Sequence, residues 1–343
     1  MREARFIRKN VEKWNRYQHT ENNDPDEMAD RFITLLDDLS YSKTFYPHSK
    51  VTRWINALAA SIYQGIYQNK KEKYARIFQF WKYELPLLFR KYHKVLLFTL
   101  CLFILFVTIG IFSSVVDHNY APDYFDNKVQ PGYYDATIQR IHKGDPFGVY
   151  KDANPFSMFV HIAYNNIAVA FRAVIFGVLF GIGTVVLMWQ NGVMLGCFQY
   201  IFFSQGLGWQ SVLVIWIHGT LEISAIVIAS TAGFIMGFGY LFPGTYTRIQ
   251  SFIRCAKDAM KICISLIPIF IVAAFFESYI THLMSNTFQR DSKNIGLPIP
   301  VSFLILAASF SFITWYFVIY PRRLYKKGYR SVHGVILKPE TEI

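Results

Sequence analysis

Four ionisable side chains interrupt stretches of the sequence that are otherwise long and apolar. They are Arg172, His218, Glu222 and Glu277. A charge at the centre of a bilayer costs about 2.5–3.5 kcal/mol on insertion scales, so such residues are expected to face protein or a water-filled cavity. Two amides, Asn165 and Asn166, directly precede a predicted span and are candidates for the same space.

The spacing of His218 and Glu222 places both on one face of a helix, because residues four apart lie one above the other. The same face continues as a ladder of small residues: Ala225, Ala229, Gly233 and Gly237. Small residues let helix backbones approach closely. Two glycine pairs offer surfaces for such an approach: Gly177 with Gly181, and Gly192 with Gly196. We therefore expect His218 and Glu222 to face a tight protein interior.

This polar pair has two interpretations. It can be a clasp between helices, with Arg172 or His218 as the partner of Glu222, a kind of contact worth about 0.6 kcal/mol in membrane proteins. It can also belong to a pathway for a substrate, an ion or a proton. Glu277 lies late in its predicted span, and an ion pair between Glu277 and Arg172 is a further hypothesis.

Enzymatic chemistry is not expected. The segment His218-Gly-Thr-Leu-Glu222 supplies one imidazole, whereas the His-Glu-x-x-His motif supplies two. One His, one Glu and Glu277 make an incomplete set of metal ligands. The sequence has no phosphate-binding Gly loop with its Lys and no Gly-x-Ser-x-Gly elbow. We predict that the chain is not an enzyme and uses no metal or cofactor.

The composition is typical of a membrane protein. The 343 residues are 53% apolar and 17% charged, whereas soluble domains have about 25% charged residues. Residues 95–116 run without a charge, and at about 1.5 Å per residue they are long enough to cross the ~30 Å hydrocarbon layer. The basic residues flank the predicted spans instead of forming one stripe, so we expect no nucleic-acid partner.

The distribution of charge sets the number of crossings, because cytoplasmic segments carry the excess of Lys and Arg. The N-terminus, the 244–261 loop and the tail are basic and are expected inside, whereas the polar segment 117–155, with six Asp against four Lys/Arg, is expected outside. Further spans are predicted at 170–189, 209–239, 262–281 and 298–320. Keeping the 244–261 loop inside requires one more crossing, and the short segment 191–208 is the candidate.

The sequence therefore predicts an all-α polytopic bundle of about six crossings with both termini in the cytoplasm. A turn is expected at residues 190–192, and residues 191–218 are expected to form a short, broken or re-entrant helix. The breaks are predicted at Gly206-Leu-Gly208 and His218-Gly219.

We divide the chain into a cytoplasmic helical domain (1–93), a transmembrane bundle (94–321) whose external loop domain is 117–155, and a basic cytoplasmic tail (322–343). The basic, aromatic segment 73–92 either lies in the headgroup layer or packs as an ordinary helix.

Three stretches carry a recognisable pattern. The first runs Asn165-Asn-Ile-Ala-Val-Ala-Phe and continues with Gly177, Gly181, Gly183-Thr184, Asn191-Gly192 and Leu195-Gly196. The second holds His218-Gly219, Leu221-Glu222, Ala225, Ile228-Ala229 and Gly233, and the third is Ala273-Ala-Phe-Phe-Glu277-Ser-Tyr-Ile-Thr281. Together, over about residues 90–325, they resemble the stage II sporulation protein M family. Where the family pattern continues with Pro after Thr281, this sequence has His282.

The resemblance implies an integral protein of the cytoplasmic (inner) membrane. The family's namesake acts in engulfment beside peptidoglycan hydrolases as their membrane anchor, but members also occur in bacteria and archaea that form no spores, so sporulation is not carried over. The positions that match are Asn165, Asn166, His218, Glu222 and Glu277, and no catalytic role comes with them.

We predict a component that anchors or couples a cell-envelope complex through protein partners. The alternative is a transporter, channel or flippase that uses Glu222, His218 and Glu277. The ladders of small residues also permit a homodimer.

Overall fold

The computed structural model describes residues 3–19, 25–67, 75–148, 154–289, 295–332 and 335–337. Within these residues the chain is almost entirely helical and divides into two compact units, Met1–Arg76 and Ile77–Ile343. Six helices of the second unit are long and apolar enough to cross a membrane. The predicted all-α polytopic bundle is therefore confirmed as a fold class.

The first unit is a set of three helices: α1 (Glu3–His19), α2 (Pro25–Phe45) and α3 (Lys50–Tyr67). Its core holds Phe6, Trp14, Leu35 and Ile55, each less than 5% exposed. The indole Nε1 of Trp14 donates a hydrogen bond of 2.8 Å to Asp38 Oδ2, so the polar end of the largest core side chain is satisfied. The unit has a hydrophobic core of its own.

Three short helical segments come next: α4 (Ala75–Gln79), which contains the boundary between the two units, η1 (Phe80–Glu84, a π-helix) and α5 (Leu85–Lys91). Leu85, Leu88 and Phe89 are buried in the core of the membrane unit. Of the two interpretations of segment 73–92, ordinary packing therefore holds for α5. Residues 73 and 74 lie outside the described residues.

The first span, α6 (His93–Val116), leads into two helices predicted as external loop, α7 (Tyr120–Lys128) and α8 (Tyr133–His142). Phe125 of α7 packs against Val193 and Ile201. Burial raises the pKa of Tyr124 to about 12, so its hydroxyl stays protonated and donates to the carbonyl oxygen of Gln190 at 2.9 Å. The two helices are thus packed onto the bundle.

The next two spans begin and end elsewhere than predicted. One span consists of α9 (Pro155–Ile175) and η3 (Phe176–Val178, a 3-10 helix), and the next is α10 (Ile182–Ser204). The helix is interrupted between Val178 and Ile182. The predicted span 170–189 and the turn at 190–192 are therefore wrong. Asn154 starts α9 early, because its side chain accepts hydrogen bonds from two backbone N–H groups. The chain turns at Phe180 and Gly181 instead, both with positive φ.

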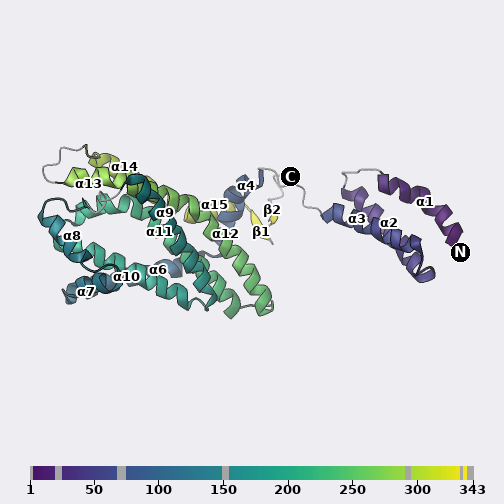
Figure 1. The fold of residues 1–343 in the computed structure, drawn as a ribbon, viewed down its shortest axis with the longest axis horizontal. Helices are drawn as coiled ribbons and strands as arrows, with labels where there is room; N and C mark the ends of the chain where they lie inside the picture. The colour runs from purple at the N-terminus through teal and green to yellow at the C-terminus, as the bar shows by residue number, and fades with distance from the viewer. Residues whose placement is uncertain are drawn as a thin grey trace. The chain divides into compact units, whose positions relative to one another are not determined.

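The long central helix is α11 (Gly208–Leu241), preceded by a turn in which Gly206 has a φ of 73°. The predicted break at His218-Gly219 is wrong, because both residues lie inside continuous helix. The predicted break at Gly206-Leu-Gly208 is confirmed, because α10 ends at Ser204 and α11 begins at Gly208. The expectation of a short or re-entrant segment is wrong, since α10 is a regular helix of 23 residues and a candidate span. α11 contacts each of the other five candidate spans, so it forms the centre of the bundle (Figure 1).

A long helical rod and a shorter one complete the bundle. The first comprises α12 (Arg248–Phe275), η4 (Phe276–Thr281, a π-helix) and α13 (His282–Phe288). The second comprises α14 (Ile299–Thr314), η5 (Trp315–Ile319, a π-helix) and α15 (Tyr320–Lys326). A small antiparallel hairpin, β1 (Arg330–Val332) with β2 (Val335–Leu337), pairs Ser331 with Ile336 in the predicted tail.

Candidate functional site

Three ionisable side chains from two helices converge inside the bundle. His218 and Glu222 project from one face of α11, one turn apart, and Glu277 projects from η4. One ligating atom from each residue lies within 4.8 Å of those of the other two. His218 Nε2 is 4.0 Å from Glu277 Oε1, and His218 is only 5% exposed. We call this cluster of His218, Glu222 and Glu277 the polar triad.

A π-helical segment sets the position of the third member. Insertion of an i→i+5 pattern rotates the side chains that follow it relative to an α-helix, and such segments are frequent at functional sites. Within η4, the hydroxyl of Thr281 donates to the carbonyl oxygen of Phe276 at 3.1 Å. Thr281 is fully buried, and its Oγ1 also lies 3.0 Å from His218 Nδ1. The segment therefore presents both Glu277 and Thr281 to α11.

The hydrogen bonds of Thr281 assign the hydrogen on the imidazole. A hydroxyl has one hydrogen to donate, and that of Thr281 is directed to Phe276 O. With that hydrogen on Phe276 O, Thr281 accepts in the 3.0 Å contact and His218 Nδ1 carries the hydrogen. In the neutral ring, Nε2 then carries the lone pair and is directed toward Glu277.

The two amide residues of the predicted site, Asn165 and Asn166, differ in burial. Asn166 is 5% exposed and its side chain lies beside the Glu222 carboxylate. No hydrogen-bond partner lies within bonding distance of its Nδ2 atom in the described structure. Asn165, the next residue back along α9, is exposed. Asn166 therefore joins the polar triad and Asn165 does not.

Arg172 does not join the triad either. It is exposed, and its Nε donates to Ala168 O, one turn back on α9, at 3.2 Å. Among the described residues no ion pair connects Arg172 with Glu277 or Glu222, so the proposed pairs are wrong. The error has a simple cause. Because α9 starts at Pro155, Arg172 lies in its last turn and not at the start of a span.

The small residues of α11 lie where the helices approach most closely. Ala225 and Ala229 are fully buried. An added Cβ on Gly177 would overlap the backbone of Gly233, and one on Gly237 would come within 2.6 Å of Gly181 N. Close backbone contact of this kind explains why these positions hold glycine.

The glycine pair Gly192 and Gly196 packs against α6 and not against the small-residue ladder of α11. Added Cβ atoms on Gly192 and Gly196 would meet Phe106 and Val107 of α6, not α11. All six glycines of the two pairs and the ladder therefore have neighbours inside this chain, and they provide no argument for a homodimer.

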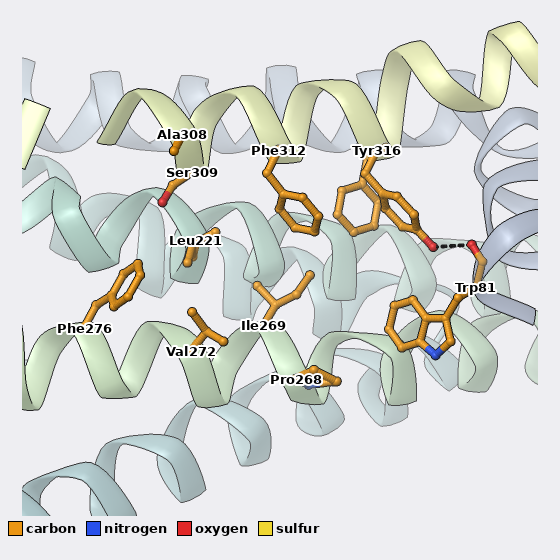
Figure 2. Close-up of a pocket in the computed structure, with 11 residues that line it drawn as sticks. Trp81, Leu221, Pro268, Ile269, Val272, Phe276, Ala308, Ser309, Phe312 and Tyr316 are labelled. Atoms are coloured by element: carbon orange, nitrogen blue, oxygen red, sulfur yellow. Dashed lines mark hydrogen bonds between the residues drawn. The ribbon is translucent and has the colours of Figure 1, made fainter. Parts of the chain in front are cut away.

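Two apolar pockets lie in the bundle. One, of about 350 Å³, lies between α12, α14 and η1, with Pro268 and Trp81 among its lining residues (Figure 2). The other, of about 800 Å³, lies between α6, α11 and α14, with Arg90, His93 and Arg322 among its lining residues. No triad residue lines either pocket. The triad thus lies outside both pockets, with His218 buried and Glu222 and Glu277 partly exposed.

Three features of the site were not predicted from the sequence. The π-helix, the role of Thr281 and the selective burial of Asn166 all depend on packing between helices. Thr281 lies four residues after Glu277, a spacing that could have suggested a shared face. The two Asn residues are adjacent and were indistinguishable without the orientation of α9.

A bundle of six membrane-length helices that encloses a polar cluster defines the chain as a polytopic α-helical membrane protein. A family model described as Stage II sporulation protein M matches residues 99–282, which include every member of the triad. The chain belongs to the stage II sporulation protein M family. A second model, described as a domain of unknown function (DUF8413), matches residues 4–68. No curated protein and no solved structure matches the chain.

Proposed function

We propose that the chain is a non-enzymatic component of the cytoplasmic membrane that anchors or couples a cell-envelope complex, with both termini in the cytoplasm. The observation that carries this proposal is the division into two units, Met1–Arg76 and Ile77–Ile343. A solute pathway requires only the membrane unit. An anchor requires in addition a folded surface that a partner can bind, and the three-helix unit supplies one.

The surface of the first unit supports this role. It has an apolar core, yet it also carries exposed large apolar side chains on α2 and α3: Ile33, Leu36, Phe45, Trp54 and Tyr63. Ile33 and Leu36 are 58% and 42% exposed and lie three residues apart, so they share a face of α2. Apolar patches on soluble surfaces often mark sites of protein association.

The helices α7 and α8 supply a second surface. They are held against α10 through Phe125 and Tyr124, so a partner bound there would be fixed to the bundle. On the proposed topology this layer lies outside the cell, and the N-terminal segment lies in the cytoplasm. A chain with one folded surface on each side of a bilayer is suited to couple components across it.

Native gel electrophoresis of crosslinked membranes tests the proposal. We expect the full chain to run in a complex larger than the chain itself. The double variant Ile33→Asp/Leu36→Asp should lose that complex, because it places charges on the apolar face of α2. Asn56→Asp/Ala57→Asp is the matched control, since it adds the same charge at exposed positions of α3. A complex of the same size in both variants, or none for the full chain, would contradict anchoring through this surface.

A flux assay separates the transport alternative. The purified full chain in liposomes should move neither protons, ions nor labelled lipid. Flux that disappears in a folded Glu222→Gln variant would replace the anchoring proposal with transport through the polar triad.

A further inference from the structure

We propose that the polar triad, completed by Asn166, binds one divalent transition-metal ion of the Zn²⁺ type that clamps α9, α11 and η4 together. His218 Nε2, one oxygen each from Glu222 and Glu277, and the amide oxygen of Asn166 would be the four ligands. The role is structural. It is independent of the anchoring proposal, since it concerns the bundle alone.

The distances fit a shared ion better than direct contact. His218 Nε2 and Glu277 Oε1 are 4.0 Å apart, which is too long for a hydrogen bond. Zinc binds nitrogen and carboxylate oxygen at about 2.0–2.2 Å, so tetrahedral ligand atoms are about 3.4 Å from one another. The triad atoms lie within 4.8 Å of one another. Closing the site around an ion thus requires shifts of roughly 1 Å, given these bond lengths.

The imidazole of His218 is oriented by a hydrogen bond at one ring nitrogen, as is usual for histidines that bind a metal. A ligating His almost always donates its second ring N–H to an oxygen, which fixes the orientation of the ring and leaves the other nitrogen for the metal. Here Thr281 Oγ1 accepts from Nδ1, and Nε2 is directed at Glu277. Thr281 itself is fixed by its hydrogen bond to Phe276 O. Thr281 lies in η4, the same segment that carries Glu277.

Asn166 provides a second, separate indication of a ligand. Its side chain is buried, and its Nδ2 faces the Glu222 carboxylate without meeting the geometry of a hydrogen bond in the described structure. A buried polar atom without a partner costs free energy and calls for an explanation. The two ends of an amide side chain are assigned from hydrogen bonds, and turning the amide would direct its oxygen toward the triad.

The charges of the site require a cation or a proton. Two carboxylates this close repel each other unless something positive lies between them, and Glu222 and Glu277 are only partly exposed. Among the described residues no Lys or Arg forms an ion pair with either carboxylate. One divalent ion would neutralise both, and the neutral imidazole would add a bond without adding charge.

The donor set indicates the kind of ion. One nitrogen with oxygen ligands suits zinc and neighbouring first-row metals. Calcium takes six to eight oxygens, and magnesium usually keeps several waters. Four protein ligands leave no open position, which is the pattern of structural zinc sites, whereas catalytic sites keep one position for water. The site is therefore consistent with a chain that carries out no reaction.

Metal analysis of the full chain tests the inference. The chain is purified in detergent through a tag that contains no histidine, stripped with a chelator, and titrated with Zn²⁺ alone. We expect one zinc per chain and a higher unfolding temperature when zinc is bound. Glu277→Gln and His218→Asn should each weaken binding by at least 10-fold. Thr281→Val, which removes the hydrogen bond to the ring and the one to Phe276 O, should weaken it by about 10–100-fold.

Controls keep the result decisive. Glu84→Gln and His161→Asn remove a carboxylate and an imidazole at positions away from the triad, and both should bind zinc as the original chain does. Zinc binding that is equal in His218→Asn, Glu277→Gln and Thr281→Val overturns the proposal. Absence of zinc binding by the folded full chain also overturns it, and would leave a shared proton between the carboxylates. If the Glu277 and His218 variants fail to fold, Thr281→Val decides alone.

Discussion

The close approach of α9 and α11 can be tested with two glycines of the same helix. Gly233 lies where the backbones meet, and Gly219 lies fourteen residues earlier on α11. A methyl group on Gly233 would overlap the carbonyl oxygen of Ala173 and come within 2.5 Å of Thr184 Oγ1. These are the two atoms of a buried 2.8 Å hydrogen bond. A methyl group on Gly219 would have no heavy atom within 4 Å.

The expected magnitudes follow from these distances. Overpacking costs about 1–3 kcal/mol when the neighbours are unable to move aside, and around Gly233 one of the two close atoms belongs to the backbone. Both substitutions to alanine gain the same helix propensity, up to about 1 kcal/mol. Gly219→Ala should therefore be neutral or slightly stabilising. Gly233→Ala should be less stable than Gly219→Ala by about 1–3 kcal/mol, which is roughly a 5- to 150-fold change in the unfolding equilibrium.

Reversible unfolding of the purified chain in mixed micelles measures this difference. Both variants are compared with the original chain under one set of conditions, so the detergent contributes equally. Equal stability of the two variants would refute the packing argument, as would a loss in Gly219→Ala. It would mean that α9 and α11 do not approach at Gly233, and that the glycine ladder has another cause.

Three further changes test the other parts of the structure. Thr247 and Gln250 form a capping box at the start of α12, so Thr247→Ala should lower the free energy of unfolding by about 1 kcal/mol in the same micelle experiment. An unchanged free energy of unfolding would contradict this role of the capping box. Leu35→Ala should cost about 2–5 kcal/mol in the three-helix unit, whereas exposed Ile33→Ala should change little; urea unfolding followed by tryptophan fluorescence distinguishes them. Burial, and to a smaller extent the nearby Asp258, raises the pKa of Tyr92 above its ordinary value of 10.0. Above pH 10 the folded state therefore keeps a proton that the unfolded chain loses, so the stability of the folded state should fall as the pH rises. Tyr92→Phe should weaken that dependence, and an unchanged pH profile would count against the buried phenol.

The spans themselves could be predicted because a single physical rule determines them. A charge-free run of 22 residues has few alternatives to crossing a bilayer, and the first span was predicted at 95–116 and observed as α6 (93–116). The ends of α9 and α10 were predicted wrongly because Asn191-Gly192 resembles a turn. In the structure Gly192 is helical and packs against Phe106 of α6, a contact that local sequence does not encode.

The polar triad was predictable in part for the same reason. His218 and Glu222 are four apart, so helical geometry alone places them together. The approach of Glu277 depends on the packing of α12 on α11 and on the register shift in η4, neither of which follows from spacing. Arg172 was assigned to the site by an incorrect start of α9. Asn166 was identified, but its separation from Asn165 needed the orientation of that helix.

Six crossings of the membrane bring the triad residues together inside the bundle, and cysteine labelling in intact cells tests this topology most directly. The four native cysteines are replaced, and single cysteines are introduced at the exposed positions Gln130, between α7 and α8, and Thr245, between α11 and α12. A membrane-impermeant maleimide should label Gln130→Cys in intact cells and Thr245→Cys only after permeabilisation. Labelling of Thr245→Cys in intact cells would contradict the crossing scheme and remove the reason for the triad to lie inside the membrane.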